Sequence, residues 1–275
     1  MRPVLLPLLL LFLLAACATA PPLPQSSESH SLDPARERVV RAALTEWEAW
    51  GRPVQIGWAL TLEDGEPSPE NFPRILEYWQ AVNEGRGVVR QLRALHDQMT
   101  LALAEGGQDP LPQPSISLFA YPAWSAAFVS HVMRQAGLGE SDFPASSAHA
   151  RYIDSLLARA AVDPDWASFR PEDPLASLAQ PGDLLCADRS SLPLLHWTER
   201  LAEAGRFRPM HCDVVVTVRP GLVEAVGGNV RDSVTLRRFP ADEQGRVLQA
   251  PYGEPQFFLL LENRIGTRGR ATPQG

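Results

Sequence analysis

The sequence contains no lysine. All 25 basic residues are arginines, which are scattered singly among 32 aspartates and glutamates and leave a formal net charge of -7. A chain with this balance and no basic cluster lacks the electrostatic footprint of a protein that grips nucleic acid by its phosphates. We therefore predict no nucleic-acid partner.

Cysteine is also scarce, with three in 275 residues. Three cysteines are too few for a disulfide-built scaffold or a four-cysteine zinc site. A hydrophobic content of 45% is enough for a sizeable core, and 26 prolines with 19 glycines indicate many loops. The composition describes a mildly acidic globular protein with no predicted cofactor or metal site, in which each cysteine needs its own explanation.

A run of hydrocarbon side chains follows Arg2 and covers residues 4–14, apart from Pro7. About eleven residues in a helix span roughly 16 Å, half of a bilayer's hydrocarbon core, which suits a signal peptide and not a transmembrane helix. The run ends in LAAC at residues 14–17, which resembles the bacterial lipobox, where the cysteine thiol receives a lipid. The alternative is a plain secretory leader that happens to contain a cysteine.

The resemblance to the lipobox implies that residues 1–16 are removed and that Cys17 anchors the chain to a membrane. In known lipoproteins, an aspartate after this cysteine often retains the protein in the inner membrane. Ala18 stands there instead, which implies the periplasmic face of the outer membrane. Residues 17–32, rich in proline and serine, are predicted to form a flexible tether.

Helices are predicted in the first half of the mature chain. Asp33 and Pro34 provide an N-cap and a first-turn proline for a helix that ends near Gly51. Apolar residues at helical spacing predict further helices over residues 73–84, 87–105 and 123–136 and after residue 147.

The periodicity changes to that of strands after a proline-rich stretch. Short strands are predicted over residues 183–187, 212–218, 222–226, 233–238 and 256–261. Helices followed by a run of short antiparallel strands indicate the α+β class. One domain over residues 33–265, followed by a disordered tail at residues 266–275, is the simplest organisation.

The first candidate functional residue is Ser125, in the first turn of the helix predicted over residues 123–136. Unpaired backbone N–H groups and the helix dipole stabilise negative charge there, so a hydroxyl at this place can act as a nucleophile if a base is near. The same position also suits a serine that only caps its helix.

The second candidate is the sequence His211-Cys212-Asp213 at the start of a predicted strand. Because side chains alternate along a strand, His211 and Asp213 face one side and Cys212 faces the other. This alternation makes the three residues a poor metal-binding set. His211 suits a general base, or equally a solvated residue at the end of a strand.

The third candidate is Asn229, which follows two glycines at the end of the next strand. It can fix the tautomer of His211, as the orienting residue of a triad does, or it can be an ordinary turn asparagine. His149 ranks lower, as a structural or substrate-contacting residue. His131 lies six residues along the helix from Ser125, nearly 240° around it at about 100° per residue, and cannot partner that serine.

Together these motifs resemble papain-like amidases of the CHAP and NlpC type. In those families Trp-Cys-Ala-x-Phe-Val begins the nucleophile helix, and WSAAFV at residues 124–129 is similar. PGDL at residues 181–184 resembles their strand start, HCDV at residues 211–214 resembles their Gly-His-Val strand, and Asn229 resembles their closing asparagine. The whole pattern is similar to the domain of unknown function 2272.

The resemblance implies a papain-like, NlpC-type fold, with a helical N-terminal half packed on a small antiparallel sheet. It implies that Ser125 is the nucleophile, His211 the base and Asn229 the orienting residue. Trp124, His149 and Asp213 are then expected to contact substrate.

Ser125 departs from the pattern of these families because a cysteine stands at its position there. A serine hydroxyl is far less acidic than a thiol of pKa about 8.5, so it needs a base that removes its proton during attack. Two functions remain open. The protein hydrolyses amide bonds of peptidoglycan with a serine nucleophile, or it is an inactive envelope lipoprotein that binds peptidoglycan, muropeptides or a partner protein through the retained cleft.

Cys186 and Cys212 lie on two predicted strands that follow one another along the chain. If these strands are antiparallel neighbours, the two thiols can meet, and an exported protein permits a disulfide. The alternative is a pair of small buried hydrophobic residues.

Overall fold

The computed structural model describes residues 33–59, 67–106 and 113–267. Cys17, the predicted signal peptide and the predicted tether lie outside these residues, as does most of the predicted tail. Across the described ranges, no helix is long and apolar enough to span a bilayer. The predicted domain boundaries, leader and tether stay predictions.

The helices match the expected pattern closely. The α-helices of the described residues are α1 (Pro34–Ala49), α2 (Phe72–Gln80), α3 (Gly85–Glu105), α4 (Ser125–Gln135), α5 (His149–Val162) and α6 (Trp197–Leu201). Two short 3-10 helices, η1 (Pro69–Asn71) and η2 (Ile116–Phe119), precede α2 and α4. Asp33 caps α1 as predicted, because its side chain accepts a hydrogen bond from the backbone N–H of Ala35 at 2.8 Å.

All the described strands belong to one sheet, and six of them come from the second half of the domain. Its strands are β1 (Val54–Ile56), β2 (Phe169–Glu172), β3 (Leu184–Asp188), β4 (Met210–Arg219), β5 (Leu222–Val230), β6 (Ser233–Pro240) and β7 (Gln256–Asn263). The order across the sheet is β1-β6-β5-β4-β3-β7-β2, and only the β1–β6 pair is parallel among them. This mostly antiparallel sheet with helices agrees with the α+β class. The papain-like plan remains a prediction.

Besides the two 3-10 helices, three elements were not predicted. The strands β1 and β2 have three and four residues, and α6 has five. Segments this short carry too few turns or alternations to show a period, and they are held by their partners in the sheet or by side-chain contacts.

Both faces of the sheet are buried. On one face, Cys212, Val214 and Val216 of β4 join the large core that α1, α2, α4 and α5 contribute to. On the other face, Val215 joins a smaller cluster with Phe239 and other residues of β3, β5, β6 and β7. The alternation along β4 therefore sends its side chains into two different environments.

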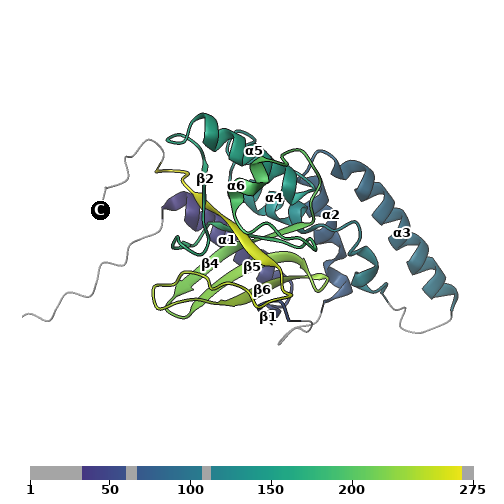
Figure 1. Cartoon of the computed structure of the whole chain (residues 1–275). Helices are drawn as coiled ribbons and strands as arrows, with labels where there is room; N and C mark the ends of the chain where they lie inside the picture. Colours follow the sequence, from purple (N-terminus) through teal and green to yellow (C-terminus); the bar gives the residue numbers. More distant parts are fainter. Residues whose placement is uncertain (1–32, 60–66, 107–112, 268–275) are drawn as a thin grey trace, which may run out of the picture. The chain divides into compact units, whose positions relative to one another are not determined.

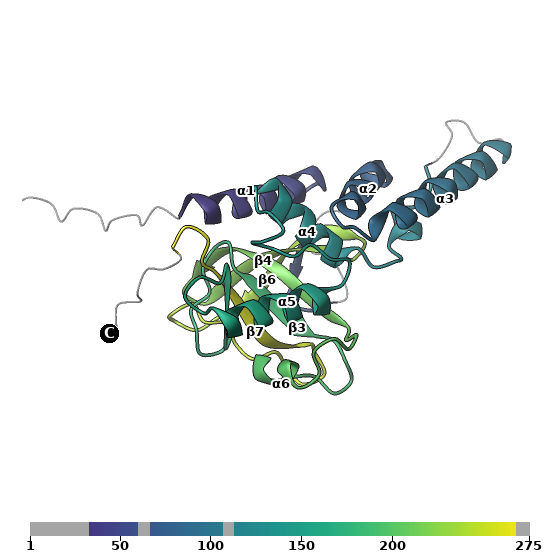
Figure 2. The same cartoon turned by 90° about the horizontal axis from the view of Figure 1, so that it is seen from above.

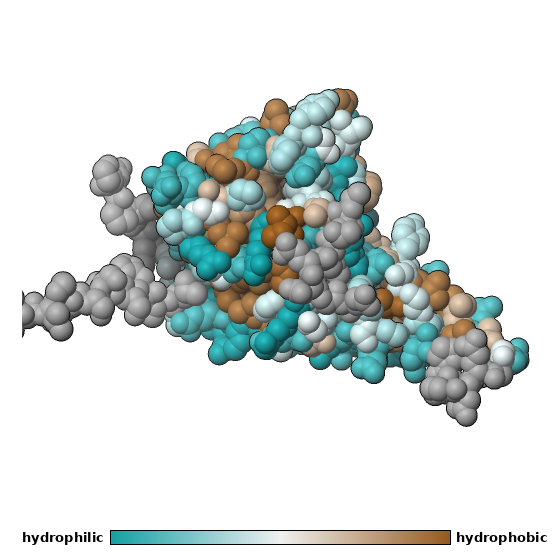
Figure 3. All heavy atoms as spheres, turned by 90° about the horizontal axis from the view of Figure 1, so that it is seen from below, coloured by the Kyte–Doolittle hydropathy of each residue, from teal (hydrophilic) through white to brown (hydrophobic). Residues whose placement is uncertain are grey.

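The arrangement of the helices is visible in two views (Figures 1 and 2). Helices α1 and α4 lie against the sheet, whereas α3 extends away from it. The face seen in Figure 3 mixes hydrophilic areas with smaller hydrophobic ones. Large apolar side chains with exposed surface occur in several separate elements, as on most protein surfaces.

Asp183 of the predicted PGDL motif holds the first helix to the sheet. Its buried carboxylate accepts hydrogen bonds from Arg36 of α1 at 2.6 Å and from the backbone N–H groups of Gln180 and Asn263 at 2.8 Å each. Burial outweighs these contacts and raises the pKa of Asp183 to about 6. Gly182 has a φ of 93°, a conformation that favours glycine, and packs on Arg36. This motif thus has a structural role.

Candidate functional site

Ser125 is the first residue of α4. Trp124 precedes it as the N-cap, and the Trp124 side chain makes no capping hydrogen bond. The hydroxyl of Ser125 lies 2.7 Å from Nε2 of His149, which is the first residue of α5. A hydrogen bond between a hydroxyl and an imidazole therefore joins the first residues of α4 and α5. The base predicted for Ser125 was His211, and the structure places His149 at the serine instead.

Tyr152 holds the other nitrogen of the same imidazole. Its hydroxyl lies 2.5 Å from Nδ1 of His149, three residues earlier on the same helix face. Burial, followed by the charge of Asp213, raises the pKa of Tyr152 well above its usual value, so the phenol stays protonated.

The ring of His149 is neutral at pH 7. Burial, together with the positive charges of His211 and Arg189, holds the pKa of His149 well below its usual 6.5, against the opposing carboxylate of Asp213. A neutral imidazole carries one proton. In the tautomer with this proton on Nδ1, the ring donates to Tyr152 and its Nε2 accepts from the hydroxyl of Ser125. That arrangement is the one a base for a serine requires.

A second pair of polar residues lies beside the first. Nε2 of His211 lies 2.8 Å from one carboxylate oxygen of Asp213, and Arg237 of β6 donates to the other oxygen at 2.9 Å. The charges of Arg237 and His211 lower the pKa of Asp213 although burial by itself would raise it, so this carboxylate is ionised at neutral pH. His211 and Asp213 share one face of β4, as their spacing predicts.

The two groups form one buried cluster. The ring centroids of His149 and His211 are 5.4 Å apart. Ser125, His149 and Tyr152 come from the helices, whereas His211, Asp213 and Arg237 come from the sheet. All six side chains are buried. The site therefore lies where the starts of α4 and α5 meet β4.

Glycines 227 and 228 make this close packing possible. A Cβ atom on Gly227 would lie 1.9 Å from Oδ1 of Asp213 and 2.9 Å from Nε2 of His211. A Cβ atom on Gly228 would lie 2.4 Å from the side chain of Phe128 in α4. Any other residue at either position would push β5 away from the site.

Asn229 does not orient His211. Its side-chain amide donates to the backbone carbonyl of Ala120 at 2.9 Å, and its φ of 54° lies in the left-handed region that asparagine tolerates. Asp213 occupies the orienting place beside His211. The predicted role of Asn229 is thus corrected to that of a residue that ties β5 to the segment before α4.

Trp124 is fully buried, which argues against its predicted contact with substrate. Its ring stacks on Trp50 with centroids 5.5 Å apart and packs against Tyr78 at 5.4 Å. Tyr78 in turn donates to Glu46 at 2.6 Å. Asp213 is likewise 1% exposed. The buried side chains of Trp124 and Asp213 therefore support the site from within the protein.

Cys186 and Cys212 form a disulfide between directly paired residues of β3 and β4. Their sulfur atoms lie in the helix-side core, because Cys212 points away from His211 and Asp213. The described residues contain no group of three or more His, Cys, Asp or Glu side chains placed to hold a metal ion.

A cleft of about 610 Å³ opens on the sheet side of the site. His211, Arg237 and Asn229 line it, together with Trp58, Arg189 and neighbouring residues. Ser125 is not among the lining residues and is 8% exposed. The cleft therefore borders the site at His211, and neither Ser125 nor His149 lines it.

The model of one protein family matches residues 73–263. Its description is an uncharacterized protein conserved in bacteria, DUF2272. The chain belongs to the DUF2272 family. The matched residues include every member of the cluster around Ser125. No curated protein and no solved structure matches this DUF2272 chain.

Sequence reasoning missed the roles of His149 and Arg237. His149 and Tyr152, three residues apart on a helix, are a readable signal for a paired imidazole and phenol. Arg237 carries no such signal, because it is one of many arginines and only the pairing of β4, β5 and β6 brings it to Asp213.

Proposed function

We propose that this DUF2272 protein is a lipid-anchored envelope protein that hydrolyses amide bonds of peptidoglycan, with Ser125 as nucleophile and His149 as base. The contact of 2.7 Å between Ser125 Oγ and His149 Nε2 carries the proposal. The resemblance of the motif order to papain-like amidases of the CHAP and NlpC type supports an amide bond as the target and peptidoglycan as the substrate.

In the proposed reaction, Ser125 Oγ attacks the amide carbonyl carbon while its proton passes to Nε2 of His149. The tetrahedral intermediate then expels the amine, which takes the proton from Nε2 as the C–N bond breaks. Water attacks the resulting acyl-serine and gives one proton to His149. Release of the acid returns that proton to Ser125 Oγ, so the enzyme is regenerated.

The groups around Ser125 can stabilise the charges that form on the substrate and on His149 during the proposed reaction. The first backbone N–H groups of α4 have no partner within the helix, so they can donate to an oxyanion at its start. Tyr152 accepts from Nδ1 of His149 throughout, which keeps the ring in place. The carboxylate of Asp213 favours the protonated ring that exists during the reaction.

The envelope location has two supports. The sequence at residues 14–17 resembles a lipobox, and Cys186 and Cys212 form a disulfide, which persists in oxidising compartments such as the periplasm.

Burial of the site favours a second function, in which the protein binds peptidoglycan or a partner without cutting it. Ser125 is 8% exposed and His149 is 5% exposed, so a substrate carbonyl has little open surface at which to approach the hydroxyl. In this case the Ser125–His149 contact is a structural hydrogen bond.

Release of soluble fragments from peptidoglycan distinguishes the two functions. Purified protein is incubated with peptidoglycan sacculi, and the soluble fragments are identified by mass spectrometry. We expect wild-type protein and Ser155→Ala to release the same fragments, because Ser155 only bonds to the backbone of its own helix. Ser125→Ala should release none. Fragment release that survives Ser125→Ala contradicts the proposed mechanism, and binding without release by wild-type protein supports the second function.

A further inference from the structure

The cleft beside His211 contains buried polar atoms that lack partners. Nε1 of Trp58 and Oε1 of Gln55 make no hydrogen bond to any described residue, and both side chains line the cleft. The other amide atom of Gln55, Nε2, donates to the carbonyl of Ala59, which fixes Oε1 as the free acceptor. The cleft thus offers one unused donor and one unused acceptor.

Positive charge surrounds these two atoms. Arg237 is already paired with Asp213 and also donates to the carbonyl of Gly57. Arg231 makes a hydrogen bond to the carbonyl of Ala59 at 3.3 Å and no ion pair with a described residue. Arg189 makes no side-chain hydrogen bond or ion pair within the described ranges. Its charge nevertheless lowers the pKa of His149, so its guanidinium belongs to the same electrostatic environment as the site.

The excess of positive charge is local. Among the described residues that line the cleft, Asp232 is acidic and three are arginines. Asp213 pairs with one of them, Arg237, on which the charge of Glu254 also acts. Among the described residues, Arg189 and Arg231 therefore place cationic side chains in the cleft next to the candidate catalytic cluster. Such a cleft attracts and orients anions.

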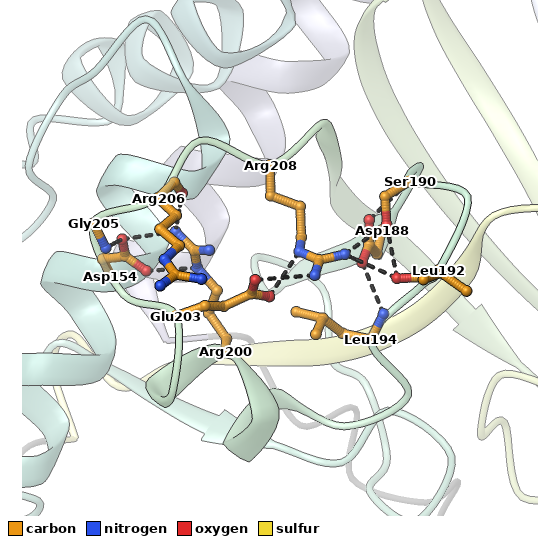
Figure 4. Close-up of polar contacts among 10 residues, drawn as sticks. All are labelled: Asp154, Asp188, Ser190, Leu192, Leu194, Arg200, Glu203, Gly205, Arg206 and Arg208. Carbon is orange, nitrogen blue, oxygen red and sulfur yellow. Dashed lines mark hydrogen bonds and ion pairs between the residues drawn. The ribbon is translucent and has the colours of Figure 1, made fainter.

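A network of ion pairs fixes the segment that begins with Arg189 (Figure 4). The carboxylate of Asp188 accepts from the backbone N–H groups of Ser190 and Leu194 and from Arg208. Arg208 also pairs with Glu203.

The chain that follows Arg189 is also fixed near Gly205 and Pro209. Asp154 of α5 binds Arg200 through both carboxylate oxygens and accepts from the backbone N–H of Gly205. The backbone N–H of Arg189 donates to the carbonyl of Pro209 at 2.8 Å. The backbone at Arg189 is thus fixed on both sides, so binding of a ligand by its side chain carries no further cost for ordering the backbone.

We propose that this cleft binds the carboxylate end of a peptide. Arg189, Arg231 and Nε1 of Trp58 would donate to the carboxylate oxygens, and Oε1 of Gln55 would accept from the amide N–H next to them. An inorganic phosphate or a phosphate ester offers mainly acceptors and leaves Oε1 of Gln55 without a partner. A peptide terminus satisfies the donors and the acceptor together.

This inference deepens the proposed function and rests on it for the identity of the substrate as a peptide. His211 lies between the cleft and His149. A peptide held by its carboxylate would therefore lie on the His211 side of the candidate site. The substrate class is an acyl peptide with a free C-terminal carboxylate.

The test compares two probes that differ in one group. The dipeptide N-acetyl-alanyl-alanine, as the free acid and as the C-terminal amide, is titrated into the full chain carrying Ser125→Ala, with isothermal calorimetry as the readout. We expect the acid to bind at least about tenfold more tightly than the amide, because the amide lacks the charge that the arginines bind. Equal affinities, or no binding of the acid, overturn the proposal.

Matched variants locate the site. Arg189→Gln and Arg231→Gln should each weaken binding of the acid about tenfold and leave binding of the amide unchanged. Arg93→Gln, on the exposed face of α3, should change neither. An equal loss in Arg93→Gln, or no loss in the other two, overturns the assignment. Equal melting temperatures exclude unfolding as the cause.

Three further outcomes distinguish the peptide-binding inference from a general anion site and from the proposed hydrolysis. Displacement of the acid by an equal concentration of inorganic phosphate identifies a general anion site and overturns the peptide assignment. Preference for the acid in a protein that cuts no amide supports the cleft and contradicts the proposed hydrolysis. Cleavage of amides without preference for the acid supports the proposed hydrolysis and contradicts carboxylate binding in the cleft.

Discussion

The hydroxyl of Ser125 lies 2.7 Å from Nε2 of His149, and the two residues are the first residues of successive helices. This contact joins α4 and α5 at the point where both face the sheet. Nδ1 of the same ring is held by Tyr152, which leaves Nε2 for the serine. A serine, a neutral imidazole and a phenol therefore form one line of hydrogen bonds.

The first prediction concerns which histidine acts on Ser125. His149→Gln should lower kcat/KM for peptidoglycan fragments by about 10²- to 10⁴-fold, the usual contribution of a general base. His211→Gln should cost less, because His211 touches Asp213 and not the serine. His96→Gln on α3 is the control, since His96 stacks on Phe72 outside the cluster. The reverse order for His149 and His211 would identify His211 as the base.

The second prediction concerns the pH profile of activity. The base must be neutral to accept the proton of Ser125, and burial keeps the pKa of His149 well below 6.5. The acid limb of kcat/KM should therefore lie below pH 6.5, with little change between pH 6.5 and 8. A limb centred at pH 6.5 or above would show that an ordinary, solvated histidine controls the rate.

The third prediction concerns stability at acid pH. The pKa of His149 is lower in the folded chain than its unfolded value of 6.5, so below pH 6.5 the unfolded chain binds a proton that the folded chain rejects. The contribution of His149 to the free energy of unfolding is thus fully present above pH 6.5 and declines as the pH falls. We expect the free energy of unfolding to fall more in wild type than in His149→Gln between pH 7.5 and 5.5. Urea unfolding at both pH values measures this difference, and parallel losses would show that His149 is not desolvated.

The fourth prediction concerns the two glycines under the site. Gly227→Ala and Gly228→Ala should each lower the free energy of unfolding by about 1–3 kcal/mol, because the new methyl group meets Asp213 or Phe128. Gly87→Ala is the matched control. It lies in α3 with open space around its Cβ position and should stabilise the protein by about 0.5–1 kcal/mol. If all three variants behave alike, the close approach of β5 to the site is not a constraint.

The fifth prediction concerns the disulfide. The double variant Cys186→Ala with Cys212→Ala should lower the free energy of unfolding by about 2–4 kcal/mol, since the bond closes a loop between residues 26 apart. Amide hydrolysis should persist, because the sulfur atoms face the helix-side core and not the cluster. In wild-type protein, an alkylating reagent should modify these two cysteines only after reduction and unfolding. Alkylation without reduction would show that the bond does not form.

Local chemistry in the sequence determined most of the elements. The cap at Asp33, the apolar spacing of α1 to α5 and the short apolar or alternating runs of β3 to β7 all act within a few residues, so their signals can be read along the chain. The same alternation correctly placed His211 and Asp213 on one face of β4 and Cys212 on the other. The motif order indicated Ser125 as a candidate nucleophile, and the structure places polar residues around it.

Only the tertiary structure decided the partners of these residues. His149 reaches Ser125 because α4 and α5 both begin at the sheet, and Arg237 reaches Asp213 because β5 pairs with both β4 and β6. Burial then sets the protonation of His149, which no short segment encodes. A hydrogen bond depends on a few tenths of an ångström between residues far apart in sequence, and that distance is a property of the packed core. The sequence thus indicated Ser125 as the candidate residue, whereas the tertiary structure determined that His149 lies beside it.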